Sequence, residues 1–131
     1  MRDIIFRGKR TDNGEWVYGA PTKDSHGETV MVESVYECEE YNCRGANCLY
    51  VDENTVGQYT GLTDKNGTKI FEGDIVKIKG KIRYIFYGTS SFRHTNYGEY
   101  AAELQDVFTE KYCEIIGNIY DNPELLRSET K

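Results

Sequence analysis

The sequence predicts an all-β protein, in which a small SH3-like barrel follows an N-terminal β segment and precedes a short C-terminal helix. Short apolar stretches separated by closely spaced turn signals are typical of antiparallel sheets. The 131 residues include 13 Gly and 17 aromatic residues but only 2 Pro, which favours a folded chain over a disordered or collagen-like one. Only one stretch carries clear helix-start signals. We assign residues 1–54 to an N-terminal β lobe and residues 55–131 to the barrel and its helix.

The N-terminal lobe begins with a predicted hairpin. Ile4–Phe6 forms the first short strand, and Trp16–Tyr18 forms the second. Between them, Asp12-Asn13-Gly14 is a turn signal because Asn and Gly tolerate positive φ. Thr29–Val35 is rich in β-branched residues and alternates apolar with polar positions, so we expect a third strand there.

The second half continues as strands and turns. Asp64-Lys65-Asn66-Gly67 is the strongest turn signal in the chain. Further strands are expected at Leu49–Val51, Thr55–Tyr59, Gly73–Tyr87, Tyr97–Leu104 and Cys113–Tyr120. We expect aromatic side chains to supply much of the core: Phe6, Trp16, Tyr18, Tyr59, Phe71 and Tyr120.

The helix is predicted close to the C-terminus. Asn122 is a good N-cap, Pro123 suits the first helical position, and Glu124 is favourable near the positive end of the helix dipole. Leu125 and Leu126 would dock this helix on the barrel. The segment 104–110 is compatible with either a helical turn or a strand.

The run from Ile75 to Tyr87 has two possible registers about Gly80. A two-residue loop at 79–80 would place Ile78 opposite Lys81 and Val76 opposite Arg83, and would therefore mix apolar with charged side chains on one face. A three-residue loop at 79–81 places Ile78 opposite Ile82 and keeps one face consistently apolar. We therefore expect the three-residue loop.

The net charge of −6 is unevenly distributed along the chain. Residues 1–65 carry 7 basic and 12 acidic side chains, whereas residues 66–131 carry 9 and 10. No acidic residue occurs from Ile75 to Gly98, and the four glutamates of Glu33–Glu40 have no base among them. The acidic total counts against a protein that coats nucleic acid by bulk charge.

Neither a membrane span nor a signal peptide is expected. No apolar run approaches the ~18 residues that a spanning helix needs. The opening segment MRDIIFRGKR has charges on both sides of only three apolar residues, unlike a secretory signal. We therefore expect a soluble, cytoplasmic protein.

Three sequence blocks carry a family resemblance. The first block is IIFRGK at 4–9, followed by GEWVYG at 14–19. The second block contains TVGQYTGL, DKNG and IFEGDIV within residues 55–76. The third block is EIIGNIYDNPELL at 114–126. Their content and order resemble the YopX-like proteins. The resemblance implies a small, largely β protein of phage or prophage origin in the bacterial cytoplasm. It implies no established activity and supplies no catalytic or binding residues.

Three of the four cysteines are candidate metal ligands. Cys38, Cys43 and Cys48 have the spacing C-x4-C-x4-C, the outer limit for a zinc site, and no second pair follows. We interpret this segment as a variable loop and keep its three cysteines only as candidate ligands. Disulfides do not suit a cytoplasmic protein. Cys113 opens an apolar strand and is expected to be buried.

No catalytic arrangement is recognisable, so we expect a non-enzyme without a cofactor. The chain lacks the phosphate-loop, zinc-protease and serine-hydrolase motifs. A catalytic Cys-His pair needs both groups in contact with an orienting third group, and nothing in the sequence places a cysteine beside His26 or His94. Asp74 is expected to cap a turn, and Arg7 is expected to pair with an acid.

The basic segment is the candidate binding site. The expected three-residue loop sets Lys77 opposite Arg83, and it gathers the candidate residues Lys77, Lys79, Lys81 and Arg83 on one face. Arg93 and His94 would extend this face, and Tyr87 would add a stacking surface. Such a surface suits an anionic partner, although lysines on a strand also protect a sheet edge from aggregation.

Two functions therefore remain open. The first is a non-enzymatic accessory protein that acts through protein–protein contacts as a homo-oligomer, with the basic segment meeting the acidic Glu33–Glu40 segment of another copy. The second is a nucleic-acid-binding barrel that uses the basic segment.

Overall fold

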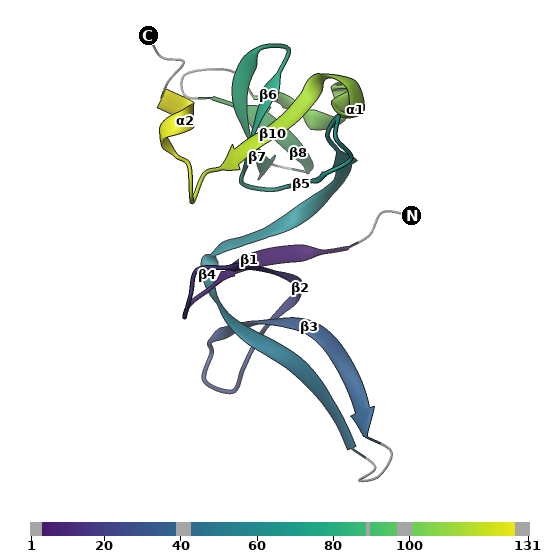
Figure 1. Cartoon of the computed structure of the whole chain (residues 1–131), viewed down its shortest axis with the longest axis vertical. Coiled ribbons are helices and arrows are strands. Elements are labelled where there is room, and N and C mark those ends of the chain that lie inside the picture. The colour runs from purple at the N-terminus through teal and green to yellow at the C-terminus, as the bar shows by residue number, and fades with distance from the viewer. Residues whose placement is uncertain (1–3, 39–42, 89, 97–100, 128–131) are drawn as a thin grey trace. The chain divides into compact units, whose positions relative to one another are not determined.

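Two antiparallel five-stranded sheets make up most of the protein (Figure 1). The computed structural model describes residues 4–38, 43–88, 90–96 and 101–127, and for residues 34–38 and 43–46 it describes the backbone alone. The helices in the described residues are each one turn long. The prediction of a mainly β fold is therefore confirmed.

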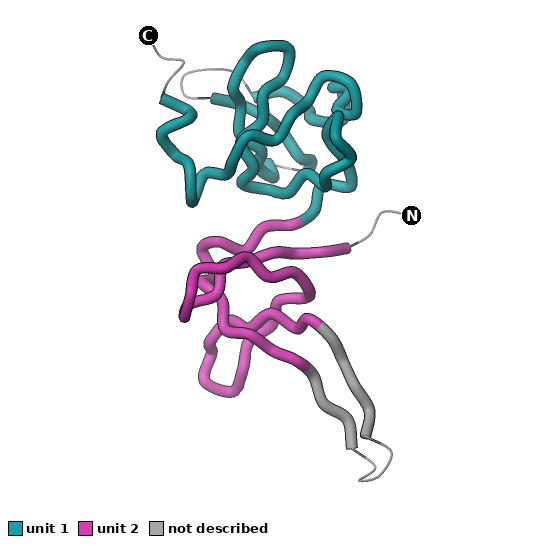
Figure 2. Tube along the Cα trace, in the orientation of Figure 1, with its two compact units in different colours: residues 1–3, 59–131 teal, residues 4–58 magenta. Residues whose placement is uncertain are grey.

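The chain divides into two compact units (Figure 2). Unit 2 is Ile4–Gln58, and the described part of unit 1 begins at Tyr59. The sequence placed this division between residues 54 and 55. Unit 2 carries 5 basic and 10 acidic side chains, so most of the net negative charge belongs to it.

Unit 2 is built from four strands. They are β1 (Phe6–Arg10), β2 (Trp16–Lys23), β3 (Thr29–Cys38) and most of β4 (Cys43–Thr63). The predicted hairpin around Asp12–Gly14 is confirmed: Lys9 pairs with Trp16, and Gly14 has φ +73°. Its first strand was expected at Ile4–Phe6 but begins at Phe6 and runs to Arg10. The two strands expected at 49–51 and 55–59 belong to one long strand, β4, which pairs with both β3 and β1.

A small apolar cluster forms the core of unit 2. Val17, Met31 and Val51 are buried, and Phe6 packs against them. Tyr18 was expected in the core but is 49% exposed. It follows Val17 in the strand, and neighbouring residues of a strand point to opposite faces. The side chain that faces the core is therefore the valine.

Unit 1 contains the second sheet, which follows the order β10-β6-β7-β8-β9. The strands are β5 (Lys69–Phe71), β6 (Asp74–Ile78), β7 (Lys81–Gly88), β8 (Ser91–Thr95), β9 (Ala102–Glu103) and β10 (Cys113–Asn118). β5 pairs with the end of β4. The 3-10 turn η1 (Leu104–Asp106) and helix α1 (Thr109–Tyr112) connect β9 to β10, so this connection is helical.

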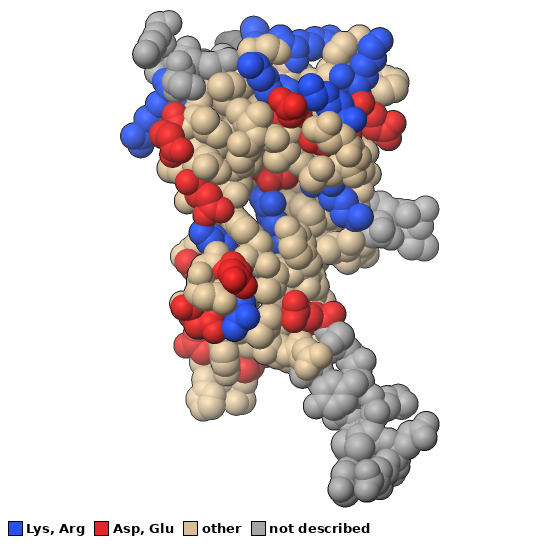
Figure 3. All heavy atoms as spheres, viewed as in Figure 1, with Lys and Arg blue, Asp and Glu red and all other residues tan. Residues whose placement is uncertain are grey.

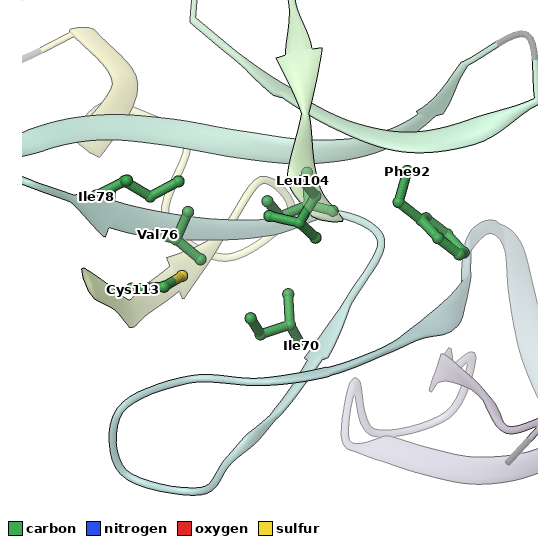
Figure 4. Close-up of a cluster of buried hydrophobic side chains, with 7 residues drawn as sticks. Ile70, Val76, Ile78, Phe92, Leu104 and Cys113 are labelled. Carbon is green, nitrogen blue, oxygen red and sulfur yellow. The ribbon is translucent and has the colours of Figure 1, made fainter. Parts of the chain in front are cut away.

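The core of unit 1 is mainly aliphatic (Figure 4). Its buried members are Ile70, Val76, Ile78, Ile85, Phe92, Leu104 and Cys113. Tyr59 and Phe71 are buried as predicted, with their ring centroids 5.6 Å apart. The predicted C-terminal helix is confirmed as α2 (Glu124–Arg127), and Leu126 is its buried residue.

The hairpin of β6 and β7 has a two-residue turn, Lys79–Gly80. Ile78 pairs with Lys81 across this turn, so the expected three-residue loop, with Ile78 opposite Ile82, is wrong. Both turn residues have positive φ, +50° and +85°, as in a type I′ turn, whose twist matches that of the flanking strands.

The observed register also separates two basic residues that were expected to face each other. Lys77 pairs with Ile82, and Arg83 pairs with Val76. A charged residue opposite a core valine was the reason for rejecting this register. The structure accommodates it because the Arg83 guanidinium is hydrogen-bonded to His94, which offsets part of the desolvation of a buried charge.

Candidate anion-binding surface

The candidate basic residues do not share one face. Lys77 pairs with Ile82, so its side chain points to the opposite side of the sheet from Lys81 and Arg83. Lys77, Lys79 and Lys81 are exposed, whereas Arg83 is only 8% exposed. The hypothesis of a single basic face depended on the three-residue loop. Because that loop is not formed, the hypothesis is also wrong.

The two arginines are engaged within unit 1. Arg83 Nε donates a hydrogen bond to His94 Nδ1 at 3.1 Å, and its Nη2 donates to the His94 carbonyl oxygen at 3.2 Å. Arg93 Nη1 lies 2.8 Å from Glu103 Oε1, and both side chains are half-buried. Tyr87 is exposed but packs edge-on against Phe92, with centroids 5.0 Å apart.

A different cationic site forms where the β6–β7 turn meets α1. The backbone N–H of Lys79 donates to the carbonyl oxygen of Tyr112 at 3.4 Å. Tyr112 ends α1, so this contact holds the tip of the hairpin beside the end of the helix. The N–H of Tyr112 in turn donates to the Phe108 carbonyl oxygen at 2.9 Å, which closes the single turn of α1.

Two ammonium groups converge on the ring of Tyr112. Lys79 Nζ lies 4.7 Å from the ring centroid and Lys111 Nζ lies 5.3 Å from it, both within the range of a cation–π contact. We call Lys79, Lys111 and Tyr112 the lysine–tyrosine cluster. In Figure 3, Lys and Arg side chains gather over the part of unit 1 that carries β6 and α1.

The surroundings of the cluster are open and aromatic. Tyr112 is 40% exposed, and Phe108, which immediately precedes α1, is 62% exposed. Lys77 pairs with Glu114 across β6 and β10, and Glu114 Oε2 also lies 3.4 Å from Lys65 Nζ. Glu114 is therefore opposite one lysine and close to a second, and neither of these lysines belongs to the cluster.

The comparisons with known proteins identify the family. Residues 5–127 match the family described as YopX protein. The chain belongs to the YopX family. The match covers nearly the whole chain, so the resemblance of the three sequence blocks is confirmed.

One solved structure shows that the YopX fold recurs. The crystal structure of protein EF1440 from Enterococcus faecalis is similar to this YopX chain with a TM-score of 0.62 and 22% sequence identity. The similarity covers 96% of this chain and 99% of that chain, and at this identity it shows the fold alone. A comparison with curated proteins gave no match.

Sequence reasoning missed the α1 half of the cationic site in this YopX chain. Phe108, Lys111 and Tyr112 lie about 30 residues beyond the β6–β7 turn. Local signals for the site are limited to a Lys-Tyr pair just before the strand at Cys113. The pairing of β10 with β6, in which Cys113 lies opposite Ile78, brings the two segments together.

The candidate metal ligands are only partly within the described residues. Cys38 ends β3, and Cys43 and Cys48 belong to β4, so the interpretation of these three positions as a loop is wrong. The side chains of Cys38 and Cys43 lie outside the described residues. Cys48 is exposed and Cys113 is buried, and both are free thiols. Among the side chains that the structure describes, no group of three or more His, Cys, Asp or Glu could hold a metal ion.

The other polar predictions concern buried side chains. Asp74 Oδ2 accepts a hydrogen bond from the Phe71 N–H at 2.7 Å, so its predicted turn role is confirmed. Arg7 is 7% exposed, and its guanidinium carbon lies 4.5 Å from the centroid of Trp16.

No helix of the described chain is long and apolar enough to cross a membrane.

Proposed function

We propose that this YopX-family protein is a non-enzymatic accessory protein of a phage or prophage, and that it binds an anionic partner through the lysine–tyrosine cluster. One observation carries the proposal: Lys79 and Lys111 come from different elements, and their ammonium groups lie 4.7 and 5.3 Å from the same ring centroid. Two exposed positive charges held this close together attract a polyanion more strongly than scattered lysines do.

The tyrosine ring prepares the lysines for binding. An exposed lysine side chain loses up to about 2 kcal/mol of rotamer entropy when it is held in one geometry. The Tyr112 ring restrains both ammonium groups before the partner arrives, so part of this entropy is already lost. Each ammonium group has three N–H donors, and those that point away from the ring remain available to phosphate or carboxylate oxygens.

The homo-oligomer remains part of the proposal. Unit 2 has twice as many acidic as basic side chains, so unit 2 of a second copy is a complementary anionic partner. The segment first proposed for this contact, Glu33–Glu40, lies mostly outside the described side chains, and Glu33 is exposed.

The proposal also retains unit 1 as an SH3-like barrel, the fold class expected from the sequence.

The test of anion binding uses long-chain polyphosphate as the probe, titrated into the full-length protein at about 50 mM salt. The variant Lys79→Glu/Lys111→Glu should lose binding. Its matched control is Lys9→Glu/Lys23→Glu in unit 2, which changes the net charge equally, and Lys9 Nζ also lies near a ring, 5.8 Å from Trp16. Equal losses in the two double variants, or no binding by the natural sequence, would reject the proposal.

Light scattering over a range of protein concentrations tests the second copy as the partner. A dimer or larger assembly that dissociates in high salt and in Lys79→Glu/Lys111→Glu supports self-association through the cluster. A monomer at every concentration rejects it.

A further inference from the structure

We infer that the lysine–tyrosine cluster also binds single-stranded nucleic acid, in competition with unit 2 of a second copy, and that Phe108 is the side chain on which a base stacks. The inference rests on the proposed function. Its own basis is the exposed phenylalanine one helical turn from the tyrosine that both lysines contact, because a basic surface next to exposed aromatic rings is how proteins hold single strands without reading their sequence.

The two aromatic residues of the site have different surroundings. Tyr112 has Lys79 and Lys111 over its ring, so ammonium groups already occupy its aromatic surface. Phe108 is 62% exposed, more than Tyr112 at 40%. The hydrogen bond from Tyr112 N–H to the Phe108 carbonyl oxygen keeps the two residues one turn apart. We therefore assign base stacking to Phe108 and phosphate contact to the lysines.

The exposed ring of Phe108 favours one of three anionic partners: a nucleic-acid duplex, an acidic peptide or a single strand. In a duplex, the faces of the bases are covered by their neighbours, so Phe108 cannot stack on them without unstacking the helix. An acidic peptide offers carboxylates to the lysines but no extended aromatic surface to the ring. A single strand offers both phosphates and accessible bases. Exposure of a large apolar ring beside two cations thus favours the single strand.

The net charge of −6 affects how strongly the binding of nucleic acid should depend on salt concentration. The acidic unit 2 repels a polyanion at long range, so binding should depend on the few contacts of the cluster. Two lysine–phosphate contacts predict a slope of about −1.4 for the logarithm of the association constant against the logarithm of salt concentration. A surface that coats nucleic acid by bulk charge has a much steeper slope.

The test is fluorescence anisotropy of labelled oligothymidine about 16 nucleotides long, the upper end of the footprint of a single barrel domain. The variants are Phe108→Ala, which removes the ring, and Phe108→Trp, which keeps an aromatic surface. Phe108→Ala should weaken binding about 5- to 150-fold, and Phe108→Trp should retain it. A duplex of the same length should bind more weakly than the single strand.

The matched control is Tyr87→Ala. Tyr87 is 53% exposed and lies on the same sheet, but it is six residues along β7 from Lys81, about 20 Å from the turn. Its removal should leave binding unchanged. Equal effects of Tyr87→Ala and Phe108→Ala, or equal binding of single strand and duplex, would reject the inference.

The experiment separates the inference from the proposed function. If polyphosphate binding depends on Lys79 and Lys111 but Phe108→Ala binds oligothymidine normally, the cluster binds anions without base stacking and the inference fails alone. If polyphosphate binding does not depend on the two lysines, the proposed function fails and the inference fails with it. Preferential binding of polyglutamate over oligothymidine would point to an acidic protein partner and would also overturn the inference.

Discussion

Arg83 Nε donates a hydrogen bond to His94 Nδ1 across β7 and β8 at a distance of 3.1 Å. The two side chains are 8% and 9% exposed. Because arginine is always a donor, His94 Nδ1 must be unprotonated, and the neutral imidazole carries its proton on Nε2. Burial lowers the pKa of His94 below its ordinary value of 6.5, and the positive charge of Arg83 lowers it further.

The lowered pKa of His94 predicts a loss of stability in mild acid. Below about pH 6.5 the unfolded chain binds a proton at His94 while the folded chain does not. The free energy of unfolding therefore falls as the pH decreases through this range, and the contribution of His94 is fully present only above it. Urea denaturation measured at about pH 7.5 and pH 5.5 should show this loss.

The variant His94→Gln tests the assignment. Glutamine can accept the hydrogen bond from Arg83 through its amide oxygen but does not titrate. The difference in stability between the two pH values should therefore be smaller in His94→Gln. His26→Gln, at the exposed histidine of unit 2, is the control. The assignment is wrong if the two variants have the same pH dependence.

The buried carboxylate of Asp64 predicts a stability difference between two similar turns. Asp64 Oδ1 accepts the N–H groups of Asn66 and Thr68 at 2.9 and 3.0 Å, and its Oδ2 accepts that of Ile115 at 3.0 Å. Asp64→Ala should lower the free energy of unfolding by about 2–4 kcal/mol, because it leaves three partly buried N–H groups without this acceptor.

Asp24 provides the matched control for this prediction. Its Oδ1 accepts the N–H groups of His26 and Glu28, both at 2.9 Å, in the same turn geometry. This turn is more exposed, so water can replace the lost acceptor, and Asp24→Ala should cost less than Asp64→Ala in urea denaturation. Equal costs would show that burial does not set the contribution of these turns.

The thiols of Cys48 and Cys113 should differ in reactivity. Cys113 is 0% exposed, and burial, followed by the carboxylates of Asp64 and Asp74, raises its pKa to about 12. Its reactive thiolate form is therefore scarce at about pH 8. Iodoacetamide should modify Cys48 in the folded protein but modify Cys113 only after denaturation. Peptide mass spectrometry measures this order, and rapid labelling of Cys113 in the folded protein would contradict it.

Local signals predicted the parts of the fold that a few neighbouring residues control. The turns at Asp12–Gly14 and Asp64–Gly67 depend on side chains that hydrogen-bond their own backbone and on glycines with positive φ. The helix at Glu124–Arg127 begins directly after the Asn122-Pro123 pair that predicted it, and Leu126 is its buried residue. Each of these features involves residues within about five positions of one another.

The register of β6 and β7 could not be predicted in the same way. The choice depended on whether Arg83 could face the core, and that depended on His94, which lies in the next strand. Alternation of apolar residues predicted that an arginine opposite Val76 was unfavourable. Hydrogen bonding of the guanidinium across the sheet reverses this preference, and no pattern within the hairpin indicates it.

The sequence was sufficient to establish the mainly β class, the principal turns and the C-terminal helix, because short-range geometry and composition control them. The YopX resemblance was visible in the three sequence blocks themselves. The folded chain was needed to bury Arg83, to separate it from the exposed lysines, and to join Lys79 with Lys111 and Tyr112. Contacts between residues about 30 positions apart depend on the pairing of β10 with β6, and strand pairing is a cooperative result of packing the whole sheet.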